Sequence, residues 1–421
     1  MIFIKILIGG SYLVTLYILI YWFLFYFEKK DFIHKDNKKI KKLKQYPLVS
    51  IIMPCFNEEK NINKSLTSIQ NLQYPKDKIE LIIINDGSTD KSEIIIKKYI
   101  KNNPKLNIKY ISQKNYGKGR ALNNGLKILK GTLFACLDAD SIVDKNALIN
   151  AVYEHSLNSN LAIVTPIMKI YKPKKYIEKF QRLEYMSAML LIKLMGYMDS
   201  NYIAPGPFSL YKTHIIKKLG GFDEDNLVED QEIAYRAQKE HYKIKQCANS
   251  LVYTIAPDNF NDLNKQRNRW FKGSIHNMYK YKEIIWNKNY GDFGVFQLSV
   301  NIIAFALAII AIIAFSYYTI RPFILWIRDL YLINFDIIPL LKNFEFQPNV
   351  LNIDLTTFVL VGLMLAMSLG MLYFSSRATN DRVRKYGVIY IIPYFFLYFI
   401  FISFVVIKVL IEILVGVKQK W

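Results

Sequence analysis

The sequence has few of the residues that build disulfide frameworks and zinc sites. Its 421 residues include three cysteines, Cys55, Cys136 and Cys247, which are far apart and lie in separate expected elements. Small buried hydrophobic residues are the simplest interpretation of such cysteines, so we expect neither a disulfide framework nor a zinc site. None of the five histidines has a second histidine at the helical spacing of a metal site.

Acidic residues are scarce relative to basic ones. Lys and Arg number 56 and Asp and Glu 34, which gives a formal charge of +22. Such an excess can indicate nucleic-acid binding. However, the sequence has no zinc-finger spacing, RNP signature or basic-zipper pattern. The densest basic run, Lys29 to Lys44, follows a long apolar stretch, so membrane topology and anionic lipid explain the charge and no nucleic-acid partner is expected.

Charge is absent from Gly9 to Phe27, a length that can cross a bilayer. A cleaved signal peptide is the alternative, but the stretch is long, aromatic-rich and lacks a small-residue cleavage pattern. We therefore expect residues 1–28 to form a retained anchor. The basic linker that follows, residues 29–47, places the next domain in the cytoplasm by the positive-inside rule, in a multi-pass protein of the cell membrane.

The last part of the chain, residues 293–421, is expected to be a membrane region with about three spans. These are residues 293–320, 355–374 and 388–407. The stretch 322–341 is apolar but carries Arg328, Asp329 and Asp336, so it is expected to lie along the membrane surface. Residues 386–416 exceed one simple span, which leaves a final surface helix before Lys418 and Trp421 as an open alternative.

The middle of the chain, residues 48–260, is mixed in polarity and reads as a soluble α/β domain. Apolar runs at residues 48–53, 79–84, 108–112 and 133–137 predict four strands. Each of the first three leads through a polar turn into a helical pattern, which predicts a parallel sheet. Open α/β sheets bind ligands at the carboxyl ends of their strands. Residues 261–292 are expected to form interfacial helices.

Polar residues follow each of these strands. Phe56 and Glu58 come after the first strand, Asp86 after the second and Lys118 after the third. Lys118 stands between Gly117 and Gly119 before a helix, where backbone amides can approach a phosphate. A plain flexible turn is the alternative reading of these glycines. Their position at a third polar strand end favours a ligand.

The fourth strand ends in Asp138 and Asp140. Alternate residues of an extended segment point the same way, so the two carboxylates can converge while Ala139 faces the other side. Two such acids repel each other unless a cation or proton lies between them, and Mg²⁺ or Mn²⁺ fits best. The alternative is that the acids cap the helix expected near Asp144.

Two further motifs lie later in the chain. Glu229 and Asp230 open a helix, where acids also stabilise the helix dipole, so a purely structural role is an alternative. The sequence NKQRNRWFKGS, residues 264–274, stands between the soluble domain and the next apolar stretch. Its Arg and Trp residues could equally anchor the membrane interface.

Together, five motifs resemble those of family 2 glycosyltransferases. They are PCFNEE at Pro54, NDGSTD at Asn85, DAD at Asp138, VED at Val228 and QRNRW at Gln266. The resemblance is specifically to the membrane-embedded branch of cellulose, hyaluronan and poly-N-acetylglucosamine synthases. It runs from about residue 49 to 270 and continues in the flanking helices. It implies a Rossmann-like GT-A domain and a nucleotide-sugar donor with UDP.

The resemblance also implies roles for single residues. On the donor side, Phe56, Glu58 and Asp86 would hold uracil and ribose, with Lys118 beside them and Asp138 near the nucleotide. Asp140, with Asp138, would bind the metal that bridges the two phosphates. Gln266 and Arg269 would embrace the diphosphate.

On the acceptor side, the resemblance makes Asp230 the general base of an inverting transfer. Trp270 would stack on the acceptor sugar, with Glu229 beside the base and Gly206 in the small-residue floor under the acceptor. The chain departs from the family at Val228, because its motif is VED where the family usually has TED. It also has Pro205, Pro207 and Phe208 around Gly206, which puts acceptor choice in doubt.

Three functions follow as expectations. The leading one is a synthase that elongates a polysaccharide, with possible passage of the product through its own helices. The second is transfer of one sugar to a polyprenol phosphate or lipid-linked glycan. The third is an inactive nucleotide-sugar sensor or exporter component. Membrane lipids are expected partners in each case, and the sequence identifies no protein partner.

Overall fold

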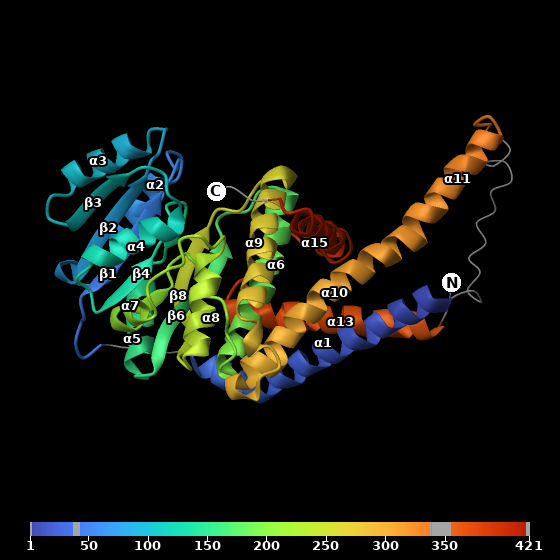
Figure 1. The fold of residues 1–421 in the computed structure, drawn as a ribbon, viewed down its shortest axis with the longest axis horizontal. Coiled ribbons are helices and arrows are strands. Elements are labelled where there is room, and N and C mark those ends of the chain that lie inside the picture. The colour runs from blue at the N-terminus through green and yellow to red at the C-terminus, as the bar shows by residue number, and fades with distance from the viewer. Residues whose placement is uncertain (1, 37–42, 337, 339–354, 418–421) are drawn as a thin grey trace.

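The structure is a computed structural model that describes residues 2–36, 43–336, 338 and 355–417. A mixed α/β domain lies on one side of the molecule, and long apolar helices extend from it (Figure 1). Several residues of the sequence analysis lie outside the described residues, namely Lys38, Lys39, Lys41, Lys42, residues 337 and 339–341, Lys418 and Trp421.

The four expected strands form one half of an eight-stranded sheet with the order β3-β2-β1-β4-β7-β6-β8-β5. Their neighbours pair in parallel, as the sequence predicts. Every residue of β1 and β2 is buried, which fits a sheet covered on both faces. The bounds are β1 (Val49–Cys55), β2 (Ile79–Asp86), β3 (Asn107–Gln113) and β4 (Leu133–Cys136).

The second half of the sheet makes it mixed rather than purely parallel. Strand β7 runs antiparallel to both β4 and β6, β6 runs parallel to β8, and β5 runs antiparallel to β8. The segment around Gly206 is irregular and leads into β7. The bounds are β5 (Ile142–Val143), β6 (Leu161–Ile170), β7 (Leu210–Lys212) and β8 (Lys243–Thr254).

Helices cover both faces of the sheet. Ile51 and Met53 of β1 join the core that contains Leu66 of α2, whereas Ile52 joins the core that contains Leu122 of α4. The period-two alternation of β1 therefore fixes two hydrophobic layers. The covering helices are α2 (Ile62–Gln70), α3 (Ser92–Asn102), α4 (Lys118–Ile128), α5 (Ala147–Ser156), α7 (Thr213–Lys218) and α8 (Glu229–Lys239).

Two longer helices, α6 (Tyr176–Tyr197) and α9 (Phe260–Lys280), stand side by side between the domain and the apolar helices (Figure 1). Helix α9 begins at an N-cap, Asn259, whose side chain accepts a hydrogen bond from Asp262 N. Short helical turns complete this region and the domain, namely η1 (Lys76–Lys78), η2 (Lys282–Ile284) and η3 (Lys288–Tyr290).

Four helical segments are long and apolar enough to cross a membrane, as the sequence predicts. They are Phe3–Ile33 within α1 (Ile2–Asp36), Phe293–Leu332, Leu355–Thr379 (α13) and Ile391–Leu414. The second comprises η4 (Phe293–Gln297), α10 (Leu298–Phe315), η5 (Ser316–Ile320) and α11 (Arg321–Leu332), and the last comprises α14 (Ile391–Pro393), η7 (Tyr394–Tyr398) and α15 (Phe399–Leu414).

Residues 321–332 form α11, which continues the line of α10 (Figure 1). The expected position of residues 322–341 along the membrane surface stays a prediction. Pro322 does not end the helix, since it lies in the first turn of α11, directly after the π-helical turn η5. The continuous segment has 40 residues, or about 60 Å at the rise of an α-helix.

The C-terminal apolar helix, by which we mean residues 391–414, differs in direction from the other three. In Figure 1 α15 is seen nearly end-on, whereas α1, α10 and α13 run across the view. It also has more of its surface covered by protein, with 28% of its most apolar window buried against 6% for the others. It packs on α9, and so brings an apolar helix directly against the domain.

Candidate active site

The loops after β1 and β2 interlock at the carboxyl edge of the sheet. Asn57 N donates to Ser88 Oγ at 3.1 Å, and Glu58 N donates to Ser92 Oγ at 2.8 Å. Asn57 adopts a left-handed φ of 54°, which asparagine tolerates better than most residues. This geometry leaves Phe56 exposed at 46%, an available apolar face at the rim.

Asp86 orders the loop that leads into α4. Its carboxylate accepts hydrogen bonds from Tyr116 N and Gly117 N, both at 3.0 Å, and from Gln113 Nε2 at 2.7 Å. Gly117 has a φ of 92°, a conformation that favours glycine. Asp86, the residue expected to contact ribose, therefore also fixes the backbone just before Lys118.

Lys118, the first residue of α4, joins two of the expected motifs. Its Nζ lies 2.7 Å from Asp138 Oδ1 and 3.1 Å from Glu229 Oε1. Burial alone would lower the pKa of Lys118, but Asp138, Glu229 and Asp230 together raise it well above the usual value. Lys118 is thus a permanent cation in an acidic cluster.

Gly206 closes over this ion pair. A Cβ at this position would come 2.6 Å from Lys118 Nζ and 3.1 Å from Asp138 Oδ2. Its backbone N donates to Asp230 Oδ2 at 3.0 Å. The loop before β7 therefore lies against Lys118, Asp138 and Asp230, and a side chain at residue 206 would displace the Lys118 ammonium group.

Asp138 and Asp140 lie in the turn just past β4. Burial, followed by repulsion from Asp138 and Glu58, raises the pKa of Asp140 to about 7. Ala139 between them is buried in the core, as the alternation predicts. The helix-capping alternative is wrong for this pair, because α5 begins at Ala147 and it is Asp144 that accepts from Asn146 N.

The acidic residues fit a hard divalent cation. Burial, then the charge of Asp138, raises the pKa of Glu58. The carboxylates of Glu58, Asp138 and Asp140 therefore repel one another, and a bound cation would reduce this repulsion. Within the described residues no group of three or more His, Cys, Asp or Glu could hold a metal by itself. Mg²⁺ often takes only one or two carboxylates and completes its shell with phosphate oxygens, so the expectation that Asp140 and Asp138 bind a cation stays a prediction.

Asp230 lies at the N-terminus of α8, in the second position of the helix. Its Oδ1 accepts from Gln231 N at 2.8 Å, so the helix-stabilising role holds as well. Burial, followed by the charge of Glu229, raises the pKa of Asp230 to about 6, although Lys118 and Arg269 pull it down. A carboxyl with such a pKa can take a proton near neutral pH.

Helix α9 brings the last motif to the same place. Arg269 Nη1 donates to Leu227 O at 3.1 Å, beside the loop that carries Glu229 and Asp230. Gln266 and Trp270 are instead both held by Arg267. Its Nη1 donates to Gln266 Oε1 at 2.8 Å, and its guanidinium lies 4.1 Å from the centre of the Trp270 ring.

The residues that support α9 were not predicted from the sequence. Arg267 stands within the QRNRW motif, and Glu184 of α6 and Tyr398 of η7 contact it. No local pattern marks them, since they come together from three helices. The one signal in the sequence for this role is that Arg267 is a charged residue within a partly apolar helix, α9.

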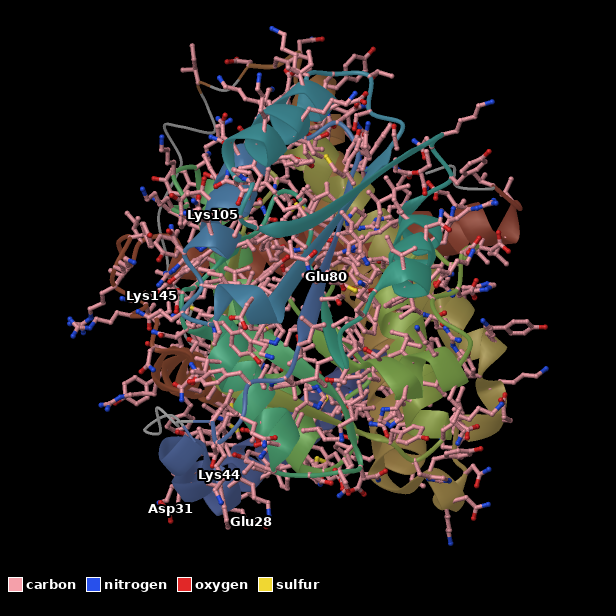
Figure 2. The ribbon with its side chains drawn as sticks, turned by 90° about the vertical axis from the view of Figure 1, so that its left-hand side faces the viewer. Glu28, Asp31, Lys44, Glu80, Lys105 and Lys145 are labelled. Atoms are coloured by element: carbon pink, nitrogen blue, oxygen red, sulfur yellow. The ribbon has the colours of Figure 1, made fainter. Side chains whose placement is uncertain are left out.

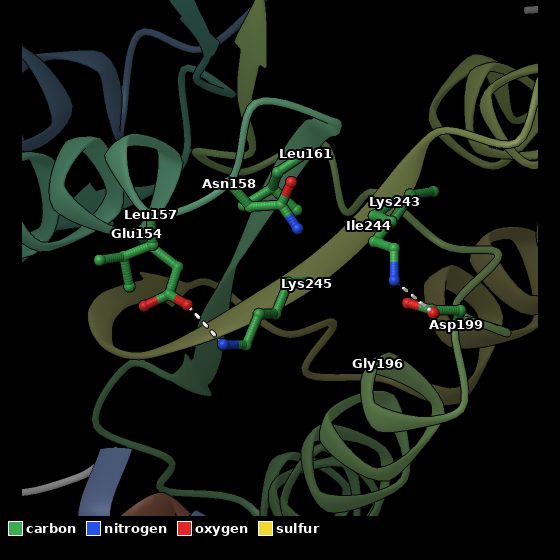
Figure 3. A pocket seen from close by; sticks show the side chains of 9 residues that line it. All are labelled: Glu154, Leu157, Asn158, Leu161, Gly196, Asp199, Lys243, Ile244 and Lys245. Atoms are coloured by element: carbon green, nitrogen blue, oxygen red, sulfur yellow. Dashed lines mark hydrogen bonds and ion pairs between the residues drawn. The ribbon is translucent and has the colours of Figure 1, made fainter.

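A separate cavity lies at the opposite edge of the sheet (Figure 3). It has a volume of about 240 Å³ and opens at the amino ends of β6 and β8. Lys245 pairs with Glu154 at 2.6 Å and Lys243 with Asp199 at 2.7 Å, so its cations are already neutralised. None of the expected site residues lines it.

Comparison with known proteins finds similarity to glycosyltransferases in this domain. Residues 50–220 match the family described as glycosyl transferase family 2. Poly-beta-1,6-N-acetyl-D-glucosamine synthase of Staphylococcus epidermidis is 32% identical over 230 residues, 53% of this chain and 54% of the relative. The enzyme of the same name from Staphylococcus aureus strain COL is 30% identical over 262 residues, 60% of this chain and 62% of the relative. The chain thus matches little more than half the length of these curated relatives.

A solved structure extends the likeness in fold to the whole chain. The mannosyltransferase PcManGT of Pyrobaculum calidifontis, solved with GDP-Man and Mn²⁺, is 15% identical with a TM-score of 0.55, covering 99% of both chains. At that identity the likeness concerns the fold alone. Residues 50–220 of this chain are thus similar to glycosyl transferase family 2, and the chain has a mixed α/β domain of GT-A type with long apolar helices attached.

Proposed function

We propose that this protein is a membrane-bound, inverting glycosyltransferase that moves a sugar from a UDP-sugar to a hydroxyl of a growing polysaccharide. One observation carries the proposal. Lys118, Asp138, Glu229 and Asp230, from three separate segments, form one charged cluster under Gly206 at the ligand-binding edge of the sheet. The name of the sequence relatives supports a polymer product, with UDP-N-acetylglucosamine as the first donor to test.

Asp230 is the proposed general base. An alcohol attacks the anomeric carbon only as its proton leaves, and a carboxylate within hydrogen-bond reach accelerates that transfer. Gly206 N and Gln231 N each bond one oxygen of Asp230 and fix its direction. The carboxylate can accept the proton through a remaining lone pair of either oxygen.

The leaving diphosphate needs positive charge. Lys118 and Arg269 are the cations that this chain places beside Asp138 and Asp230. A divalent cation held by Asp140 and Asp138 would add Lewis-acid neutralisation of the diphosphate. One base, with no second carboxylate assigned as nucleophile, supports a single in-line displacement with inversion. Binding donor and acceptor side by side supplies much of the remaining rate.

The aromatic groups have matching roles. Phe56, exposed at the rim, would lie against the uracil, with Glu58 and Asp86 near the ribose. Trp270, which is half-buried and lies beside the Arg267 guanidinium, would stack on the acceptor sugar. By the positive-inside rule, the lysines between Lys29 and Lys44 support a cytoplasmic position for the domain.

The decisive experiment is a screen of radiolabelled UDP-sugars with the purified full chain. We expect Mg²⁺- or Mn²⁺-dependent release of UDP, loss of this activity with a chelator, and loss in Asp140→Ala and Asp230→Asn. Sugar binding without turnover would instead support an inactive sensor or an exporter component. A ladder of products supports the synthase, and a single adduct on polyprenol phosphate or a lipid-linked glycan supports the alternative transferase.

A further inference from the structure

Arg267 is buried at the junction of three helices. Its side chain is 1% exposed, although it stands in α9 between Gln266 and Asn268, at the boundary between the domain and the apolar helices. A guanidinium in such a place is costly unless every charge and hydrogen bond is matched. Its partners therefore show what the site requires of it.

Two neighbouring elements hold one end of the guanidinium. Its Nη2 donates to Glu184 Oε2 of α6 at 2.5 Å and lies 3.5 Å from Tyr398 Oη of η7. Tyr398 Oη in turn donates to the same Glu184 oxygen at 2.7 Å. Burial would lower the pKa of Arg267, but the charge of Glu184 leads the groups that raise it overall.

The rest of the guanidinium holds two residues proposed to bind ligands. Nη1 donates to Gln266 Oε1 at 2.8 Å, and the guanidinium carbon lies 4.1 Å from the centre of the Trp270 ring, within cation–π range. Arg267 and Trp270 are three residues apart, so they share a face of α9. The planar guanidinium of Arg267 thus fixes the positions of both the Gln266 and the Trp270 side chains.

A second set of contacts joins α9 to the C-terminal apolar helix. Asn268 Nδ2 and Lys272 Nζ each donate to Glu412 Oε2 of α15 at 3.0 Å. The C-terminal apolar helix is therefore held to α9 at two points, through Tyr398 and through Glu412. A shift of that helix would change the contacts of Arg267.

We propose that Arg267 is a positioning residue for the acceptor site. Clamped between Glu184 and Tyr398, it fixes the plane of Trp270 and so links the seating of the C-terminal apolar helix to acceptor binding. The inference rests on the proposed function. It assigns Arg267 no contact with donor or acceptor.

The test compares the full-length wild type with Tyr398→Phe and Arg267→Lys. Tyr398→Phe removes one hydroxyl from the clamp and leaves the ion pair, whereas Arg267→Lys keeps the charge and loses the planar fork. Donors and acceptors are UDP-N-acetylglucosamine and β-1,6-linked N-acetylglucosamine oligomers. We expect Arg267→Lys to raise the KM for the acceptor about fivefold, the value of a cation–π contact of about 1 kcal/mol. Tyr398→Phe should raise it less.

The KM for the donor, and UDP affinity measured by calorimetry, should stay within twofold of the wild type in Tyr398→Phe. The matched control is Arg182→Lys, which alters another arginine that is 1% exposed and joins the domain to the C-terminal region, through two hydrogen bonds to Asp381. It should lower the melting temperature without changing the acceptor KM.

The outcomes separate the two proposals. If the wild type turns over none of the UDP-sugars, the proposed function fails. If the wild type is active and Tyr398→Phe and Arg267→Lys leave the acceptor KM unchanged, or change it only as much as Arg182→Lys does, Arg267 is a structural ion pair and the positioning role is overturned.

Discussion

Single residues at the carboxyl edge of the sheet act through their charges. Lys118 faces Asp138 and Glu229 at hydrogen-bonding distances, while Asp230 and Asp140 have raised pKa values of about 6 and 7. Burial is the main cause of both shifts. Asp230 and Asp140 can therefore take up a proton or a cation near neutral pH, which is the chemistry that the proposed transfer requires.

The first prediction concerns the base. Asp230→Asn should lower kcat by about 10²- to 10⁴-fold, the usual contribution of a general base. UDP affinity should change little, because the Asn side-chain oxygen can still accept from Gly206 N, although the hydrogen bond from Gln231 N is lost and the melting temperature falls slightly. Steady-state kinetics and calorimetry measure the two effects. Wild-type turnover in this variant would rule out Asp230 as the base.

The second prediction concerns pH. Asp230 must be ionised to accept a proton, and its pKa is raised to about 6, so the active fraction increases as the pH rises through that value. We expect kcat/KM to rise between about pH 5 and 7 and then to level off. A profile that falls over this range would contradict the assignment. Bound cation would move the rise to lower pH, which a metal titration checks.

The third prediction concerns Gly206. In Gly206→Ala the new Cβ would meet Lys118 Nζ at 2.6 Å and displace it from Asp138, so transfer should fall at least tenfold, about 1.4 kcal/mol. Gly196→Ala in α6 is the matched control, because its Cβ would have no neighbour closer than 3.7 Å. Equal activity of the two variants would show that the space above Lys118 is not needed.

At the scale of elements, a buried carboxylate holds the first strands together. Glu80 of β2, labelled within the sheet in Figure 2, is 0% exposed. It lies 2.7 Å from Lys109 Nζ of β3 and accepts from Ser50 Oγ of β1 and from Lys130 N before β4. One side chain thus joins all four strands that carry the donor-side loops.

Glu80→Gln should therefore destabilise the domain, by about 2 kcal/mol, because it leaves Lys109 without its partner at a site that is only partly shielded from water. Burial raises the pKa of Glu80, but its hydrogen bonds from Lys109, Lys130 and Ser50 lower it overall. The stabilisation is then present above the pKa of the unfolded chain and is lost as the pH falls through the lower folded pKa.

Thermal unfolding of the full chain at several pH values checks this. The difference in melting temperature between wild type and Glu80→Gln should shrink on acidification. A difference that stayed constant or grew would mean that the ionised carboxylate is not the source of the stability.

Across the whole molecule, the soluble domain and the far end of α11 should lie on opposite sides of the membrane. The segment Phe293–Leu332 starts at the domain and is about 60 Å long, twice the apolar thickness of a bilayer. Leu332 is 70% exposed at its end, and Lys105 is exposed on the domain (Figure 2).

Single cysteines at these two positions test the topology, because the native Cys55, Cys136 and Cys247 are buried. With a membrane-impermeant maleimide on intact cells, Leu332→Cys should be labelled, whereas Lys105→Cys should react only after permeabilisation. Labelling of Lys105→Cys in intact cells would place the domain outside and contradict the positive-inside assignment.

Much of the fold follows from local pattern. Apolar runs bounded by turns predicted β1 to β4, and uncharged stretches predicted the four long apolar helices, because both signals are contained in one segment. Strands β6 and β8 escaped prediction. Buried positions of β8 are filled by Gln246, Ser250 and Thr254, which hides its alternation, and Gln246 Nε2 finds a hydrogen-bond acceptor only in the folded chain, at Met189 O of α6.

The sequence by itself determined the family motifs, the edge of the sheet to which they belong and the presence of apolar helices, since each depends on residue type and short spacing. Only the tertiary structure decided that Lys118 pairs with Asp138 and Glu229, that Gly206 covers them, and that Arg267 is clamped by Glu184 and Tyr398. These contacts join residues tens to more than a hundred positions apart. Burial and Coulomb interactions act across space, so they exist only once the chain has folded.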